Sequence, residues 1–305
     1  IMTKDAFRNA LTVLQSIGGS TNGIVHLAAI AGRLGIKIDL DEFDEIGRNT
    51  QVLVDLKPSG ENYMDDMHKA GSTGPLLREL SRNLVLDTMT VNGKTLGENI
   101  SDLPPPFEQS VIRNKDNPIS QSGGIAVLKG NLAPDRAVIK HVAASPELLL
   151  HTGKAVVFRN MEDLVNRIDS PELDVDKDSV LVMQNAGPKG APGMPESGYL
   201  PIPKKLLEAG VKDMVRISDA RMSGTAFGTI VLHIAPESAV GGPLALVQDG
   251  DMIKLDVANR SLELLVSDDE LNKRRANWSP PPPHPGSERG YSKLYQDTVT
   301  QAPEG

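Results

Sequence analysis

Apolar side chains recur at the spacing of an α-helix through roughly the first 85 residues. Phe7, Leu11 and Leu14 follow Thr3 at helical intervals, and a hydroxyl residue in that place can cap a helix N-terminus. A second apolar stripe begins after the polar run 20–22 and ends before Gly35. The remaining patterns predict helices at 41–49, 62–70 and 73–80, a strand at 52–56, and a tight turn at 57–60.

From about Leu86 the pattern changes to short apolar runs separated by Gly, Pro, Asn and Asp. Such runs are typical of a β-barrel or a β-sandwich. We expect strands at 89–91, 125–128, 137–139, 155–158, 180–183, 214–218, 230–235 and 262–266, and helices at 161–168 and 203–209. The pattern therefore predicts an α+β fold in which a helix-rich part precedes a β-barrel with peripheral helices.

Proline-rich segments mark the predicted linker and the C-terminal part. Pro104-Pro-Pro106 is the expected linker or crossover. Ser267-Asp-Asp-Glu270 predicts a capping box for a charged helix that ends near Trp278. We expect the proline run at 280–283 and the polar tail after it to form an extended arm docked on a neighbour or another domain.

Composition restricts the classes of function. The chain has 305 residues, 39% of them hydrophobic, and a net charge of −8 without any basic run, which argues against a general nucleic-acid binder. No apolar run reaches the ~18 residues that a membrane span needs, and the N-terminus shows no signal-peptide pattern, so we expect a soluble intracellular protein. The chain has no cysteine, which excludes disulfides, thiolate zinc sites, cysteine nucleophiles and a thiolate-held iron–sulfur cluster within it.

The stretch 219–229 places small and hydroxylated residues between two apolar runs. Gly224 and Gly228 allow close approach of a backbone or a ligand, and Ser223 and Thr225 can present their hydroxyls toward one centre if the loop is extended. The pattern fits a site for a polar ligand. It fits a glycine-rich turn with surface hydroxyls equally well.

Two further stretches are candidates. The Gly/Pro loop 187–198 carries one carboxylate, Glu196, which is either a ligand for a hard metal ion, a base, or a solvated charge. The run 18–22 is either a helix cap or an anion site at a helix N-terminus, and caps are more frequent. The histidines show no zinc-like spacing, and 153–155 lacks the residues of a phosphate loop.

Motifs along nearly the whole chain resemble those of the dihydroxy-acid and sugar-acid dehydratase family. They are Gly18-Gly-Ser-Thr-Asn22 with His26-Leu-Ala-Ala-Ile-Ala31, Lys57-Pro-Ser-Gly60 with Met64 and His68, Gly190-Ala-Pro-Gly-Met-Pro-Glu196, Asp219-Ala-Arg-Met-Ser-Gly-Thr225, His233-Ile-Ala-Pro-Glu237 and Arg289-Gly-Tyr with Leu294-Tyr295. The Ala-Arg-Met-Ser-Gly-Thr version is more similar to the aldonate members than to the branched-chain amino-acid members, which tend to have Gly-Arg-Phe-Ser-Gly-Gly.

The resemblance implies roles for four residues. Ser223 would be the general base, Thr225 and, more weakly, Arg221 would contact the substrate, and Glu196 would be a metal ligand. The implied enzyme is a hydro-lyase that converts an aldonate or another 2,3-dihydroxy acid to the 2-keto-3-deoxy acid. In this family Mg²⁺ stabilises the enolate-like transition state and an iron–sulfur cluster polarises the leaving hydroxyl.

The resemblance also implies a domain plan and a setting. Residues 1–85 would end the α/β cluster-binding domain, 86–267 would form the β-barrel domain, and 268–305 would form the C-terminal helix and arm. The family's cluster cysteines, an aspartate pair and a carbamylated lysine have no counterpart here, so we expect an incomplete chain that is inactive alone. Family members are homodimers or homotetramers of the cytoplasm, or of mitochondria where the complete chain carries a transit peptide.

Three alternatives remain open at this point. One is a dihydroxy-acid dehydratase of branched-chain amino-acid biosynthesis. Another is a binding or scaffold protein that keeps the barrel without the cluster domain. The last is an acidic barrel domain that binds an unrelated small molecule.

Overall fold

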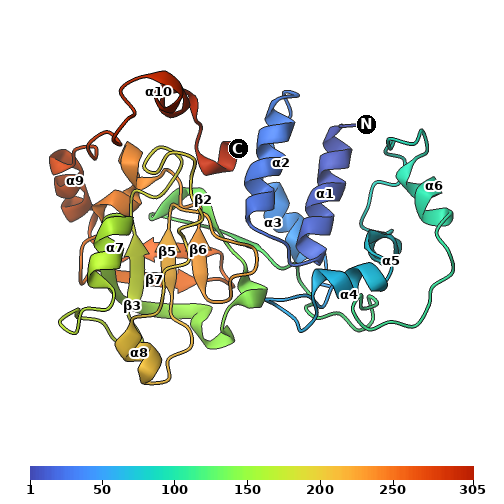
Figure 1. Cartoon of the computed structure of the whole chain (residues 1–305), viewed down its shortest axis with the longest axis horizontal. Coiled ribbons are helices and arrows are strands. Elements are labelled where there is room, and N and C mark those ends of the chain that lie inside the picture. The colour runs from blue at the N-terminus through green and yellow to red at the C-terminus, as the bar shows by residue number, and fades with distance from the viewer. The chain divides into compact units, whose positions relative to one another are not determined.

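The computed structural model describes residues 1–305, and internal contacts divide the chain into two units, residues 1–125 and 126–305 (Figure 1). Helices dominate the first unit. They are α1 (Lys4–Ser16), α2 (Asn22–Gly32), α3 (Leu40–Arg48), α4 (Met64–Lys69), α5 (Thr73–Glu79) and α6 (Leu96–Ser101). The predicted helices of this part are therefore confirmed.

Side chains close the N-termini of the first two helices in different ways. The Thr3 hydroxyl accepts a hydrogen bond from the Ala6 N–H, as its position predicts, and Phe7 and Leu11 on the same helix are buried. At α2 the Ser20 hydroxyl accepts from the Asn22 N–H, while Thr21 makes no capping bond. The polar run thus caps α2 through Ser20, and the anion site there stays a prediction.

Two predicted strands of the first unit are wrong. The run 52–56 forms only isolated β-bridges, for example between Val52 and Ser120 and between Val54 and Ile112. In the run 89–91, Met89 forms a single bridge with Thr95. Each run lacks a neighbouring strand long enough to continue a ladder. The predicted boundary at residue 86 lies inside this unit, because segment 110–120 pairs with 52–54. The functional domain plan stays a prediction.

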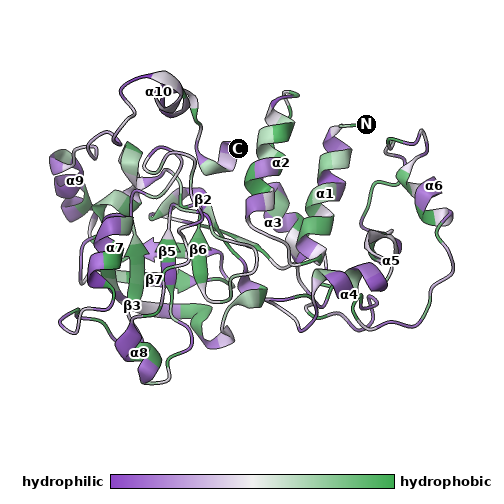
Figure 2. Ribbon diagram, viewed as in Figure 1, coloured by the Kyte–Doolittle hydropathy of each residue, from purple (hydrophilic) through white to green (hydrophobic).

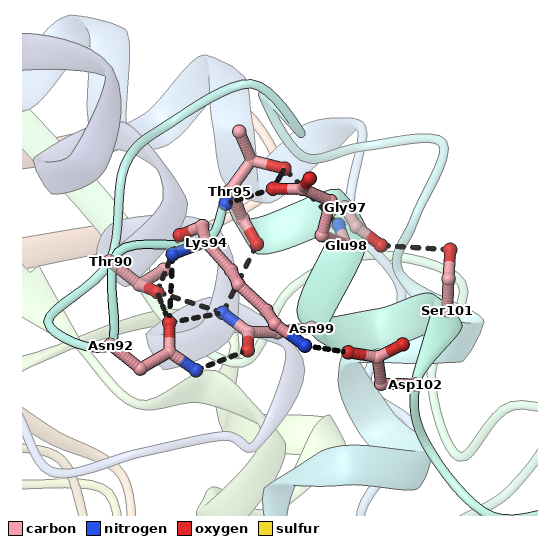
Figure 3. A network of polar contacts seen from close by, with 9 residues as sticks. All are labelled: Thr90, Asn92, Lys94, Thr95, Gly97, Glu98, Asn99, Ser101 and Asp102. Atoms are coloured by element: carbon pink, nitrogen blue, oxygen red, sulfur yellow. Dashed lines mark hydrogen bonds and ion pairs between the residues drawn. The ribbon is translucent and has the colours of Figure 1, made fainter.

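The segment 90–102 is held by a network of local polar contacts (Figure 3). Thr95 and Glu98 form a reciprocal capping box at the start of α6. Asn92 donates to Asn99 at 2.6 Å, and the Lys94 ammonium pairs with Asp102. All these partners lie within ten positions of one another, and most are exposed.

The second unit is a closed eight-stranded barrel in the order β1-β2-β6-β5-β4-β3-β7-β8. Strands β3, β4, β5 and β6 run parallel to one another, β1 and β8 are also parallel, and the other pairs are antiparallel. The strands are β1 (Ala126–Gly130), β2 (Ala133–Ile139), β3 (Leu150–Phe158), β4 (Val180–Met183), β5 (Arg216–Ser218), β6 (Ile230–Leu232), β7 (Met252–Asp256) and β8 (Ser261–Leu264). The predicted barrel is confirmed.

Strands β4 and β6 consist only of buried apolar residues, and the ribbon of β6 is coloured as hydrophobic in Figure 2. On β4, Val180 and Val182 join the core inside the barrel, and Leu181 and Met183 pack outside it with Leu164 of α7. Helices and 3-10 turns surround the strands: α7 (Met161–Arg167), α8 (Lys204–Glu208), α9 (Asp268–Asn277), α10 (Gly290–Thr298), η1 (His141–Ala143), η2 (Pro146–Leu148), η3 (Ser238–Val240), η4 (Pro243–Leu246) and η5 (Ala302–Glu304). Burial on both faces explains why these strands read as unbroken apolar runs.

The C-terminal part differs from the predicted arm. Ser267 caps α9 by accepting from the Glu270 N–H, but the predicted capping box is only half formed because the Glu270 carboxylate accepts from Arg274; the helix ends before Trp278. The tail, however, forms α10 and η5 instead of staying extended, and its Gln301 bonds to Glu237 of the same unit. The apolar residues of the tail are too few to predict a helix from their spacing. No helix in residues 1–305 has both the length and the apolar character of a membrane span.

Candidate active site

Three loops meet at one edge of the barrel because they follow neighbouring parallel strands. Strands β4, β5 and β6 lie side by side and point the same way, so the segments after Met183, Ser218 and Leu232 leave from the same edge. These segments contain Glu196, Ser223 and Glu237 respectively. We call them the β4 loop (184–203), the β5 loop (219–229) and the β6 loop (233–242).

Asp219 joins all three loops. Its side chain is buried, and its carboxylate accepts hydrogen bonds from the Ala186 N–H at 2.9 Å and from the Ser238 N–H at 2.8 Å. Burial raises the pKa of Asp219 to about 6, and the negative charge of Glu237 adds to the increase. The first residue of the β5 loop therefore holds the start of the β4 loop and the middle of the β6 loop.

Glu237 holds the turn at the start of the β4 loop. Its buried carboxylate accepts from the N–H groups of Lys189 and Gly190, and from the Gln301 side chain at 2.8 Å. A Cβ at Gly187 would lie 2.7 Å from this carboxylate, so a larger residue would push the turn away. Gly187 is thus explained by its close approach to Glu237, whereas Gly190 approaches the backbone of Asn185.

Arg221 bridges the β4 and β5 loops on both sides of Glu196. Its Nε donates to the Met194 carbonyl, and its own carbonyl accepts from the Gly198 N–H at 2.8 Å. Met194 and Gly198 each lie two residues from Glu196, and Arg221 lies two residues from Ser223. This bridge connects the segments that carry the two predicted site residues. The predicted contact of Arg221 with a substrate stays a prediction.

Ser223 and Thr225 face each other on the surface of the β5 loop. Their hydroxyl oxygens are 3.0 Å apart, and the Ala226 N–H donates to the Ser223 carbonyl to close a turn. Both side chains are exposed, as is Glu196. The spacing of two residues does bring the hydroxyls together. The chemical roles of these three residues stay predictions.

Buried charge anchors the far end of the β5 loop. Asp213 accepts from both the N–H and the hydroxyl of Thr229 and pairs with the Arg216 guanidinium at 2.8 Å. The side chains of Asp213 and Arg216 are only 4% and 1% exposed. Although burial raises the pKa of Asp213, hydrogen bonds from Thr229 and the charge of Arg216 outweigh it, and the pKa lies below its usual range.

Two buried titratable side chains near the β5 loop, Lys140 and His233, were given no role by the sequence analysis. Lys140 follows β2, is 4% exposed, and donates from Nζ to the Gly224 carbonyl at 3.2 Å; burial lowers its pKa to about 8. His233 has a left-handed backbone (φ 56°), and burial, with the charge of Arg221, lowers its pKa to about 3. A lysine that ends an apolar run was a usable signal for the first. The second lies in the motif His233-Ile-Ala-Pro-Glu237, but that motif alone gave it no role.

The chain alone does not make a complete metal site. No group of three or more His, Asp or Glu side chains in residues 1–305 is placed to hold a metal ion, and there is no cysteine. One exposed carboxylate falls short of the roughly six oxygen ligands around Mg²⁺, several of which are usually waters. Glu196 could supply one ligand of a larger site, but these residues do not fit a resident Mg²⁺ or an iron–sulfur cluster by themselves.

Comparison with known proteins assigns both parts of the chain to one family. Residues 1–99 match the dihydroxy-acid/6-phosphogluconate dehydratase N-terminal model, and residues 110–305 match the C-terminal model. Members of this family are generally metal-dependent.

Similar proteins match over the whole chain. The chain is 50% identical to L-arabonate dehydratase of Azospirillum brasilense, covering 100% of the chain and 53% of the relative. It is 48% identical to 6-deoxy-6-sulfo-D-gluconate dehydratase of Pseudomonas putida, and 41% identical to dihydroxy-acid dehydratase of Methanothrix thermoacetophila, covering 100% of the chain and 52% and 55% of these relatives. The chain spans about half the length of these curated relatives. With both family models matched in order, the chain belongs to the dihydroxy-acid/6-phosphogluconate dehydratase family.

Proposed function

We propose that the protein containing this chain is a hydro-lyase that converts an aldonate to its 2-keto-3-deoxy acid. The observation that carries the proposal is the pair of exposed hydroxyls of Ser223 and Thr225, on a loop whose ends are fixed by Asp219 and Asp213. Rigid support for exposed polar groups is what a catalytic site requires. The identities of 48–50% with relatives named for sugar-acid substrates favour an aldonate.

Ser223 is proposed to take the C2 proton of the substrate. The C2–H bond breaks, a proton moves to Oγ of the deprotonated serine, and the electron pair forms the C2–C3 double bond as the C3 hydroxyl leaves. The resulting enol tautomerises to the keto acid. A serine hydroxyl is a weak base at its ordinary pKa, so the alkoxide, formed by loss of the proton to solvent, needs nearby positive charge.

Thr225 and Arg221 are proposed to contact the substrate. The Thr225 hydroxyl lies 3.0 Å from that of Ser223, within reach of a group bound beside the base. Arg221 already uses its Nε to hold the β4 loop at Met194, so its remaining N–H groups are the ones available for a carboxylate. Both contacts orient the reacting carbon toward Oγ of Ser223.

Glu196 is proposed as one oxygen ligand of Mg²⁺. An exposed carboxylate on a loop tied to the Ser223 segment suits a hard cation. The other ligands, and those of an iron–sulfur cluster, would come from outside these 305 residues. The complete protein is proposed to be a cytoplasmic homodimer or homotetramer.

The second candidate substrate is a branched 2,3-dihydroxy acid, favoured by relatives named dihydroxy-acid dehydratase at 41–42% identity. A keto-acid assay with a panel of pentonates, hexonates and a branched dihydroxy acid separates the candidates. The assay uses the complete protein, purified without oxygen, and its Ser223→Ala variant. We expect turnover of an aldonate, lowered at least ~10²-fold in the variant because a general base contributes roughly 10²–10⁴-fold. Full activity of Ser223→Ala would overturn the assignment of the base.

A further inference from the structure

Ser223 requires a positive charge nearby if it is to act as a base, and the buried Lys140 contacts the β5 loop. Lys140 directly follows β2, which is not one of the three strands that carry the site loops. Its Nζ lies 3.2 Å from the carbonyl of Gly224, the residue between Ser223 and Thr225. Lys140 thus contacts the β5 loop at the peptide between Gly224 and Thr225, one residue after the proposed base.

The position of Lys140 is set by the barrel. β2 pairs antiparallel with β6, with Ile139 opposite Val231, so the end of β2 lies beside the strand that follows the β5 loop. In η1, the next turn of the chain, the Ala143 carbonyl accepts from the Gly228 N–H at 2.8 Å. The segment 140–143 therefore supports the middle and the end of the β5 loop together.

Burial of this ammonium group has an energetic cost that a structural role does not require. A buried lysine loses hydration, and an apolar side chain of similar length would fill the same volume without that loss. The pKa of Lys140, lowered by burial to about 8, still leaves the group mostly protonated at neutral pH. The site therefore keeps a cation at low exposure, where its field is weakly screened.

We propose that Lys140 is a positioning residue that holds the Gly224 carbonyl, and with it the Ser223–Thr225 turn, and that its positive charge favours the alkoxide of Ser223. The inference rests on the proposed role of Ser223 as the base. Lys140 acts through Ser223 and has no assigned contact with the substrate.

The test is a double-mutant cycle in the complete protein. Lys140→Met removes the charge and the hydrogen bond, and Lys140→Gln removes the charge but keeps a polar donor. Each is measured alone and combined with Ser223→Ala. The matched control is Lys177→Met, because the Lys177 side chain is 70% exposed and pairs with Asp178.

We expect each neutral variant to lower kcat about 10²-fold, at the lower end of the contribution of a general base, with a smaller change in KM. In the Ser223→Ala background the same substitutions should have almost no further effect, because the base through which Lys140 acts is absent. Lys140→Arg, which keeps the charge, should retain more activity than Lys140→Gln. Thermal unfolding shows which variants are folded. If Lys140→Met does not fold, the kcat values of Lys140→Gln and Lys140→Arg test the inference.

Three outcomes distinguish the inference from the proposed function. Full activity of Ser223→Ala would overturn the role of the base and with it this inference. Loss in Ser223→Ala but unchanged kcat in folded Lys140 variants would overturn the inference alone. Equal losses from the Lys140 substitutions with and without Ser223 would show a structural role and overturn it as well.

Discussion

Two polar networks in this chain have similar chemistry but different positions. The network at 90–102 in the first unit joins residues no more than ten positions apart, and its Lys94–Asp102 pair has side chains 52% and 59% exposed (Figure 3). The network at the barrel edge joins Asp219 to Ala186, 33 positions away, and Glu237 to Gln301, 64 positions away. Asp219 and Glu237 are each 1% exposed.

The difference shows which polar contacts position the candidate site. Exposed ion pairs and local caps contribute little because water competes for the same groups. A buried carboxylate accepts hydrogen bonds from backbone N–H groups of several loops. Its removal leaves those N–H groups buried without an acceptor, which lowers the free energy of unfolding more than the loss of an exposed ion pair does. The loops that carry Glu196 and Ser223 are therefore held by buried charge, whereas the 90–102 network only shapes a surface turn.

Asp213→Ala should have the largest effect on stability. It leaves the Arg216 guanidinium buried without its carboxylate and removes the acceptor for the Thr229 N–H. Breaking a buried pair costs about 3–5 kcal/mol of unfolding free energy. Denaturant unfolding measures the loss. The control, Asp178→Ala, removes an exposed pair with Lys177 and should leave the midpoint unchanged.

Asp219→Ala should come next. The substitution orphans the N–H groups of Ala186 and Ser238, each worth about 1–3 kcal/mol, so we expect a loss of about 3 kcal/mol. Hydrogen exchange should also increase at those two amides. The matched control is Asp102→Ala in the exposed network. If the two variants unfold at the same denaturant concentration, the contrast between the networks is wrong.

His233 should make the barrel sensitive to acid. Burial lowers its pKa to about 3 from the ordinary 6.5, so the unfolded chain binds more protons between these values. The stabilisation is complete above pH 6.5 and is lost as pH falls toward 3. His233→Asn does not titrate and tolerates the left-handed backbone. Unfolding measured across this window should fall less steeply for the variant than for the wild type, and parallel curves would contradict the assignment.

Thr95→Ala should have the smallest effect. It removes half of the capping box of α6 at an exposed helix end, which costs about 1 kcal/mol or less. Thermal unfolding of the variant, compared with that of Asp219→Ala, measures the gap between the two networks. A loss as large as that of Asp219→Ala would show that the local network supports more than its own turn.

The sequence predicted the elements better than their connections. Val180–Met183 is the predicted strand residue for residue, because burial on both faces makes an unbroken apolar run. The run at 52–56 is also mainly apolar, apart from Asp55, but it lacks a paired strand, and pairing is set by the rest of the chain. Motif resemblance supplied Ser223 and Glu196. Lys140 could not be assigned from sequence because its partner, Gly224, is 84 positions away.

The central claim is that Ser223 takes the C2 proton of an aldonate, and a pentonate carrying deuterium at C2 tests it most directly. The complete protein should release the deuterium to water, give a keto acid with only solvent hydrogen added at C3, and show a primary isotope effect on turnover. Ser223→Ala should lose at least ~10²-fold of this release. Deuterium found at C3 of the product, or release at the wild-type rate from Ser223→Ala, would contradict the account.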